Sequence, residues 1–116
     1  MAGFKDLLVW QKGVELSVEV YAATEKLPKE ERFKLSSQMT DAAVSIPSNI
    51  AEGHRRNNKK EFIHFLGIAL GSAAELETQL IITARVYRHV DVTQLIEDAN
   101  EIQRMLYSML KKLKQT

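Results

Sequence analysis

The chain has 116 residues, no cysteine and a formal net charge of +1. The absence of cysteine excludes a disulfide framework, a thiol nucleophile and a cysteine metal site. The near-zero charge excludes nucleic-acid binding through a global positive field, so any contact with phosphate must come from a local basic patch. A chain of this length fits one domain, which we place over residues 1–116.

The location of the protein is predicted from two features of the chain. Its start, residues 1–6, lacks the charged-then-apolar pattern of a signal peptide. No apolar run approaches the roughly 18 residues of a membrane span. We therefore expect a cytoplasmic protein without a membrane partner.

Apolar residues recur every three or four positions along most of the chain, and strand-like alternation is nearly absent. Helices are expected over about 5–27, 33–53, 59–89 and 92–113. Asn58 followed by Glu61 resembles a capping box at the start of the third. Because the connections are short, the pattern predicts an all-α fold, an antiparallel up-down four-helix bundle.

A proline lies in the middle of the second predicted helix. Pro47 removes one backbone donor and crowds the carbonyl of Ala43, which costs about 3 kcal/mol in a helix interior. We therefore expect this helix to be bent or interrupted near Pro47, and Gly53 to end it with a left-handed backbone. Small residues crowd around the break, so that another backbone can come close: Ala42, Ala43, Ser45, Ser48, Ala51 and Gly53.

Polar residues follow the other side of this helix. Ser45, Asn49 and Glu52 share one face near Pro47. One interpretation is a solvated face. The other is that these groups bond across to a neighbouring helix or subunit and satisfy the carbonyl that Pro47 frees. Both interpretations stay open at this point.

The densest positive segment of the chain runs over 53–60 and is expected to be a loop. Such side chains can contact phosphates through salt-sensitive backbone binding. A solvated charged loop is an equally good interpretation. Few aromatic residues are expected near it, so sequence-specific RNA readout is not indicated. The candidate nucleic-acid-binding residues are His54, Arg55, Arg56, Lys59 and Lys60.

Catalytic and metal chemistry find little support in the sequence. A di-iron bundle needs two Glu-x-x-His pairs, and this chain has one, Glu61 with His64. We expect Glu77 to be partly buried and held by an arginine or a hydroxyl, because an unpaired buried charge is costly. No serine lies in a nucleophile elbow and no glycine-rich phosphate loop occurs. We therefore expect no enzyme activity, no metal and no cofactor.

Apolar surface is in excess for a single bundle. The first helix carries two apolar stripes, one of which includes Trp10. On the third helix Gly67 and Gly71, one turn apart, leave a groove for a neighbouring helix. Surplus apolar faces usually mark partners, so the sequence predicts a closed homo-oligomer.

Several segments together resemble a known bacterial family. The chain opens with Phe-Lys-Asp-Leu and Val-Trp-Gln-Lys at 4–12, and continues with Leu-Ser-Ser-Gln-Met at 35–39. Ala-Ala-Val-Ser-Ile-Pro-Ser-Asn-Ile-Ala-Glu-Gly follows at 42–53, and Glu-Phe-Ile-His-Phe-Leu at 61–66 precedes Gly-Ser-Ala-Ala-Glu-Leu-Glu-Thr at 71–78. These motifs are similar to those of the 23S rRNA-intervening-sequence proteins, and the similarity weakens only in the last helix.

The resemblance implies a four-helix bundle that assembles as a ring-shaped homopentamer. It also implies an association with large-subunit ribosomal RNA genes, or with reverse transcriptases of diversity-generating retroelements. Two functions follow: a non-enzymatic ring that binds structured RNA through basic loops, or a scaffold for another protein such as a reverse transcriptase. Thr40 and Asp41 stand where relatives commonly carry two arginines, which weakens an RNA surface at the start of the second helix.

Overall fold

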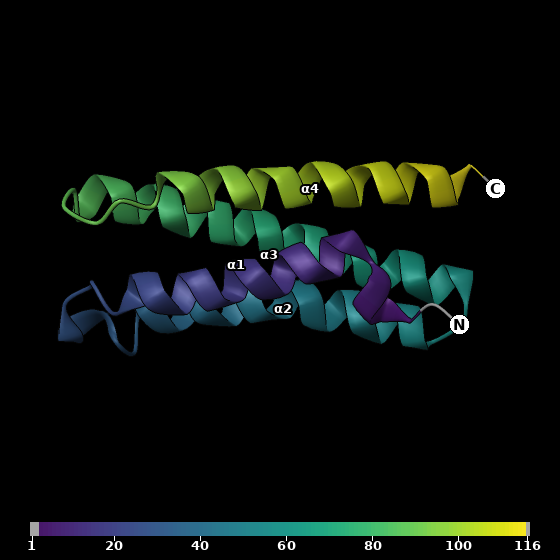
Figure 1. Cartoon of the computed structure of the whole chain (residues 1–116), viewed down its shortest axis with the longest axis horizontal. Coiled ribbons are helices and arrows are strands. Elements are labelled where there is room, and N and C mark those ends of the chain that lie inside the picture. The colour runs from purple at the N-terminus through teal and green to yellow at the C-terminus, as the bar shows by residue number, and fades with distance from the viewer. Residues whose placement is uncertain (1–2, 116) are drawn as a thin grey trace.

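The computed structural model describes residues 3–115, so the ends of the predicted 1–116 domain, residues 1–2 and 116, lie outside the described residues. Consecutive long helices run in alternating directions, and both chain ends lie at the same end of the molecule as the α2–α3 connection (Figure 1). The prediction of an all-α, antiparallel four-helix bundle is confirmed. In order, the elements are the 3-10 helix η1 (Phe4–Asp6), α1 (Leu8–Thr24), the 3-10 helix η2 (Lys29–Glu31), α2 (Leu35–Arg55), α3 (Lys59–Val86) and α4 (Thr93–Lys114).

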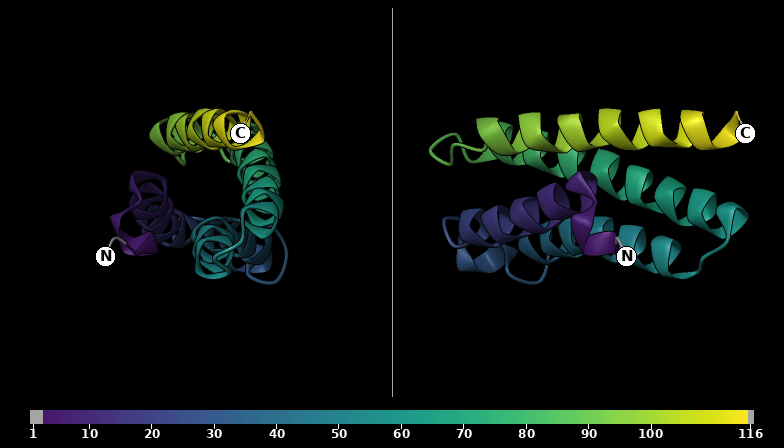
Figure 2. Two further views of the ribbon diagram at one scale, coloured as in Figure 1. Left: turned by 90° about the vertical axis from the view of Figure 1, so that its right-hand side faces the viewer. Right: turned by 45° about the vertical axis from the view of Figure 1, so that its right-hand side comes forward.

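The four helices are arranged around one apolar core (Figure 2). The most extensive packing joins α2 to α3, and the least extensive packing between long helices joins α1 to α4. On α1 the core stripe is Val9, Leu16 and Val20, all buried. The second apolar stripe of this helix points outward, where Tyr21 is 55% exposed. The chain itself therefore covers this stripe only in part, because Trp10 is half-buried whereas Tyr21 is exposed.

Helix α1 is shorter than expected, because it ends at Thr24 instead of near Leu27. Pro28 does not close it directly but precedes η2. At the start of α3, Asn58 caps the helix as predicted: its Oδ1 accepts a hydrogen bond from the Glu61 backbone N–H at 3.0 Å. This local pairing fixes where α3 begins.

Gly53 does not end α2 as predicted. The helix continues to Arg55, and the left-handed residue is Asn57, with φ of 55°. Gly53 is buried where α2 meets α3, and a Cβ placed on it would lie 2.7 Å from the Cβ of Phe65. The glycine is therefore required for close helix approach and not for a turn.

Pro47 does not interrupt α2, which runs without a break from Leu35 to Arg55. The carbonyl that Pro47 leaves without a helical donor belongs to Ala43, and it accepts a hydrogen bond from the Ser17 Oγ of α1 at 3.0 Å. The same hydroxyl lies 2.9 Å from the Gly13 carbonyl. A Cβ on Gly13 would lie 3.3 Å from the Pro47 Cδ. The proline thus lies at a close α1–α2 contact, and this contact supplies the hydrogen bond that the Ala43 carbonyl would otherwise lack.

Among residues 3–115, one helix, α3, is long and apolar enough to cross a membrane by length and composition alone. This finding differs from the prediction that no apolar run of the sequence approaches the length of a membrane span. In the bundle, the buried residues of α3 include Leu66, Ala73 and Leu80, which belong to the apolar core. Helix α3 thus contributes part of its apolar surface to the core of the bundle.

The end of the bundle away from the chain termini is closed by polar contacts. The Tyr87 hydroxyl donates a hydrogen bond to the Glu31 carboxylate, which raises the pKa of Tyr87. The Thr93 backbone N–H donates to Asp91 Oδ1 at 3.1 Å and lowers the pKa of that carboxyl. This end carries exposed acidic as well as basic side chains.

Candidate nucleic-acid interface

The basic segment predicted as a loop is mostly helical. His54 and Arg55 form the last residues of α2, and Lys59 and Lys60 are the first of α3. The connection itself is only 56–58. Arg55, Arg56, Lys59 and Lys60 are exposed, whereas His54 is half-buried. The candidate cations are thus carried by two adjoining helix ends and, for Arg56, by the short connection between them.

Each candidate arginine is held by neighbouring side chains. The Arg56 guanidinium bonds Glu52 Oε1 at 2.8 Å, an ion pair that raises the pKa of Arg56. Arg56 Cζ also lies 5.1 Å from the centre of the Phe65 ring, and Arg55 Cζ lies 5.8 Å from that of Phe4. The Arg56–Glu52 pair lies at the surface, with both side chains about half exposed, 48% and 51%. Exposed pairs of this kind leave the guanidinium accessible to a ligand.

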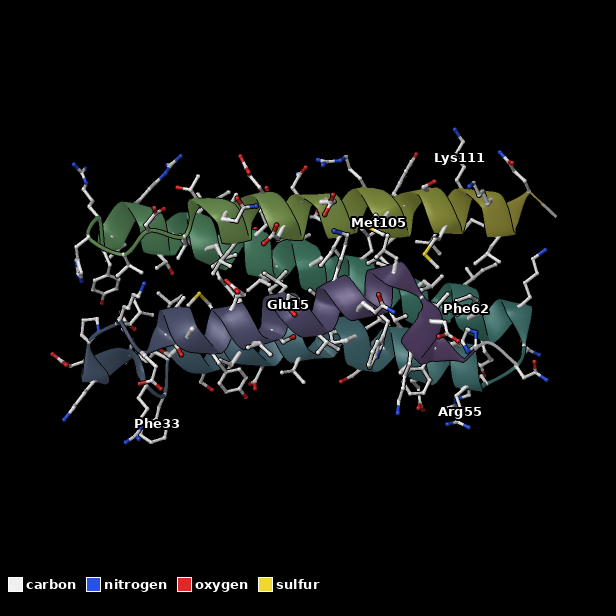
Figure 3. All side chains as sticks on the ribbon, viewed as in Figure 1. Glu15, Phe33, Arg55, Phe62, Met105 and Lys111 are labelled. Atoms are coloured by element: carbon white, nitrogen blue, oxygen red, sulfur yellow. The ribbon has the colours of Figure 1, made fainter. Side chains whose placement is uncertain are left out.

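More cations lie at the same end of the molecule. Figure 3 shows Lys111 of α4 at the end that also carries Arg55 and Phe62. Lys112 and Lys114 share the last turn of α4 with Lys111, and all three are basic. These lysines are distant from the α2–α3 segment in the sequence and were not among the predicted nucleic-acid-binding residues. An up-down topology places the end of α4 beside the start of α3. The predicted topology could therefore have linked these lysines to the α2–α3 segment. We call this region the basic end, formed by Arg55, Arg56, Lys59, Lys60, Lys111, Lys112 and Lys114.

The expectation of few aromatic residues near this segment was wrong. The His54 ring packs edge-on against Phe62 at 5.8 Å between centres, and His64 against Phe65 at 5.2 Å. Trp10, a predicted interface residue, is half-buried and packs against Phe4 at 5.4 Å. Rings from η1, α1, α2 and α3 therefore gather beside the cations.

The polar face of α2 bonds to the neighbouring helix α3. The hydroxyls of Ser45 and Ser72 lie 2.8 Å apart, and Asn49 Nδ2 donates to the Ser45 carbonyl at 2.7 Å. The prediction that this face satisfies the carbonyl freed by Pro47 was wrong, because Ser17 of α1 does so. Of this face, Ser45 joins α2 to α3, whereas Asn49 bonds within α2 and Glu52 bonds Arg56.

Glu77 is half-buried as predicted, but its partner is neither an arginine nor a hydroxyl. The Gln103 amide of α4 donates to Glu77 Oε1 at 2.5 Å. His64, the histidine of the lone Glu-x-x-His pair, is exposed. Within residues 3–115 no group of three or more His, Cys, Asp or Glu side chains is placed to hold a metal ion. Glu77 therefore acts as an α3–α4 contact in this geometry.

Gly67 and Gly71 lie on an exposed face of α3. A Cβ on either would have no atom within 4 Å. Within the described residues 3–115, no other helix occupies the groove predicted there.

Comparison with known proteins places this geometry in a family. A sequence model described as "23S rRNA-intervening sequence protein" matches residues 5–108. The chain belongs to this family. The match spans α1, α2, α3 and most of α4, including Arg55, Arg56, Lys59 and Lys60 of the basic end but not its three α4 lysines, and it confirms the resemblance drawn from the motifs.

A solved relative of the family has the same architecture. It is a protein of unknown function from the S23 ribosomal protein family of Bacteroides thetaiotaomicron VPI-5482, determined at 1.70 Å resolution. The TM-score is 0.79 at 27% sequence identity, and the similarity covers 90% of this chain and 99% of that one. No curated protein matches the chain. The relative therefore shares the whole bundle.

Proposed function

We propose that this member of the 23S rRNA-intervening sequence family is a non-enzymatic, cytoplasmic bundle that binds structured RNA with its basic end. The observation that carries the proposal is the gathering of cations from α2, α3 and α4 at one end of a chain whose net charge is only +1. Lysine and arginine side chains bind phosphates by releasing counterions, so the binding should weaken steeply with salt. The family description, which refers to 23S rRNA, supports RNA as the partner.

The opposite end offers a matched control for this proposal. Arg55→Ala, Arg56→Ala and Lys60→Ala together remove three cations from the basic end, whereas Arg32→Ala, Lys34→Ala and Arg88→Ala remove three exposed cations elsewhere. We expect the first variant to bind an RNA hairpin about 10- to 100-fold more weakly, with a shallower dependence on salt, since each lost phosphate contact reduces the slope by about 1. The second should lose less than about 3-fold. Fluorescence anisotropy from low to high salt measures both.

Equal losses in the two variants would remove the basic end as the binding site. A wild-type protein that binds no RNA at low salt would overturn the proposed function as a whole.

We also propose that the protein self-associates through the outer face of α1. Val18 and Tyr21 are 62% and 55% exposed and line an apolar groove together with Val14, Val44 and Pro47. Contiguous exposed apolar groups of this kind are typical of interaction surfaces. The resemblance stated above implies a ring of five copies. If the same face holds a different protein, such as a reverse transcriptase, the isolated chain will be a monomer.

The same exchange of valine for glutamate, made once on this face and once away from it, tests the proposal. Val18→Glu should dissociate the assembly, because a charge would be buried without a partner in the interface. Val86→Glu makes the same exchange at a residue that is 60% exposed on α3, and it should leave the assembly intact. Light scattering on purified protein reports the mass relative to the 13.2 kDa chain. A wild-type mass of one chain at high concentration would contradict self-association.

A further inference from the structure

The two rings that lie against the arginines of the basic end are not part of the core. Phe62 and Trp10 are half-buried against the core cluster, but Phe4 and Phe65 belong neither to that cluster nor to the side chains packed on it. Both are half-buried. These are the rings that lie 5.8 Å and 5.1 Å from the guanidinium carbons of Arg55 and Arg56. Each arginine thus has an aromatic ring beside it at the molecular surface.

The two arginine–ring pairs are held in place by their surroundings. The Arg56 guanidinium bonds Glu52 of α2 at the surface. Phe4 packs edge-on against Trp10, and Phe65 against His64. The pairs come from η1 with the end of α2, and from the end of α2 with α3. Planar groups held in this way lose little freedom when a ligand stacks on them.

A site that bound only duplex phosphates would need charge but no rings. In a duplex the base faces are covered by their neighbours, so that a protein reaches mainly the backbone. In single strands and loops the base faces are open, and they stack on aromatic rings and on arginine planes. The combination of cations with arginine–ring pairs therefore fits unpaired nucleotides better than a duplex.

We propose that the basic end binds single-stranded RNA segments, such as loops, with bases stacked at the Arg55–Phe4 and Arg56–Phe65 pairs and the lysines on the phosphates. This inference rests on the proposed function, since it specifies the RNA that the same site takes. Stacking is tolerant of sequence, because every base has a π-face.

The test replaces planar arginine guanidinium groups by the compact ammonium groups of lysine, so that the net charge of the protein stays the same. Arg55→Lys with Arg56→Lys keeps both positive charges but removes both guanidinium planes. Arg32→Lys with Arg88→Lys makes the same exchange away from the basic end and is the matched control. The probes are an oligoadenylate of about 12 nucleotides and an RNA duplex with a similar number of phosphates. Fluorescence anisotropy at one fixed salt concentration gives the affinities.

We expect wild type to prefer the single strand, and the Arg55→Lys/Arg56→Lys variant to lose about 10-fold or more for the single strand but less than about 2-fold for the duplex. The control variant should change neither. Phe4→Leu, which keeps all charges and an apolar side chain, should lower single-strand affinity in the same selective way. Far-ultraviolet circular dichroism melting confirms that each variant is folded.

Two results would overturn the inference while leaving the proposed function intact: salt-sensitive duplex binding as tight as single-strand binding, or an equal loss for both probes in the Arg55→Lys/Arg56→Lys variant. If wild type binds neither probe at low salt, the proposed function fails together with the inference.

Discussion

Gly53→Val is expected to lower the free energy of unfolding by about 3 kcal/mol. A Cβ at this position would lie 2.7 Å from the Cβ of Phe65 and 3.2 Å from Cδ1 of Phe62. The Phe65 Cβ is attached directly to the α3 backbone, so it cannot move aside by rotation of its side chain. The small gain in helix propensity from replacing a glycine, below about 1 kcal/mol, does not offset this overlap. Helices α2 and α3, which share the most extensive packing in the bundle, would have to separate at Gly53.

The same exchange on the exposed face of α3 is the control. Gly71→Val introduces an identical side chain in a helix interior where a Cβ has no atom within 4 Å. Its effect should stay within about 0.5 kcal/mol of wild type. Urea unfolding followed by circular dichroism measures both variants. Similar stabilities for the two variants would show that α2 and α3 do not need the close approach at Gly53.

Ser17→Ala is expected to lower the free energy of unfolding by about 1–3 kcal/mol, because it leaves the buried Ala43 carbonyl without a donor. The cause is the proline: Pro47 has no N–H to give to that carbonyl, and Ser17 Oγ supplies the hydrogen bond from α1 at 3.0 Å. Pro47→Ala restores the helical N–H. In that background the same Ser17→Ala change should cost less than about 0.5 kcal/mol.

The four proteins form a double-mutant cycle, and the expected coupling between the two positions is about 1–2 kcal/mol. The cavity that Pro47→Ala leaves beside Gly13 does not affect the coupling energy, because both proteins in the Pro47→Ala background contain it. An equal cost of Ser17→Ala in both backgrounds would mean that the hydroxyl stabilises the protein without serving the carbonyl.

Local patterns in the sequence predict the helices better than they predict the contacts between them. The Asn58–Glu61 cap needs only residues three apart, so it could be found by inspection. The partner of the Ala43 carbonyl lies on another helix, and nothing near Pro47 in the sequence points to Ser17. Gly53 was given a turn role because glycines often end helices. Its actual role depends on the distance to α3, which no local pattern contains.

The candidate site was likewise predicted in part. The cations at 54–60 were identified from their density in the sequence, although all but Arg56 lie on helix ends instead of a loop. The lysines of α4 and the Phe4 ring were missed because they are distant in the chain, and only the up-down topology brings them to the same end. Thr40 and Asp41 lie on α2 well before its basic end, so they do not belong to this site.

The molecule is a rod of 46 × 20 × 20 Å, and the basic end is one of its two tips. Such a rod has a direction, so the way in which copies align decides what they present. Subunits standing side by side and pointing the same way would place every basic tip on one rim, where a single RNA could touch several tips at once. Subunits pointing in opposite ways would divide the basic tips between two rims and lose that gain. The relative orientation of neighbouring subunits thus affects the affinity for RNA as much as any single arginine does.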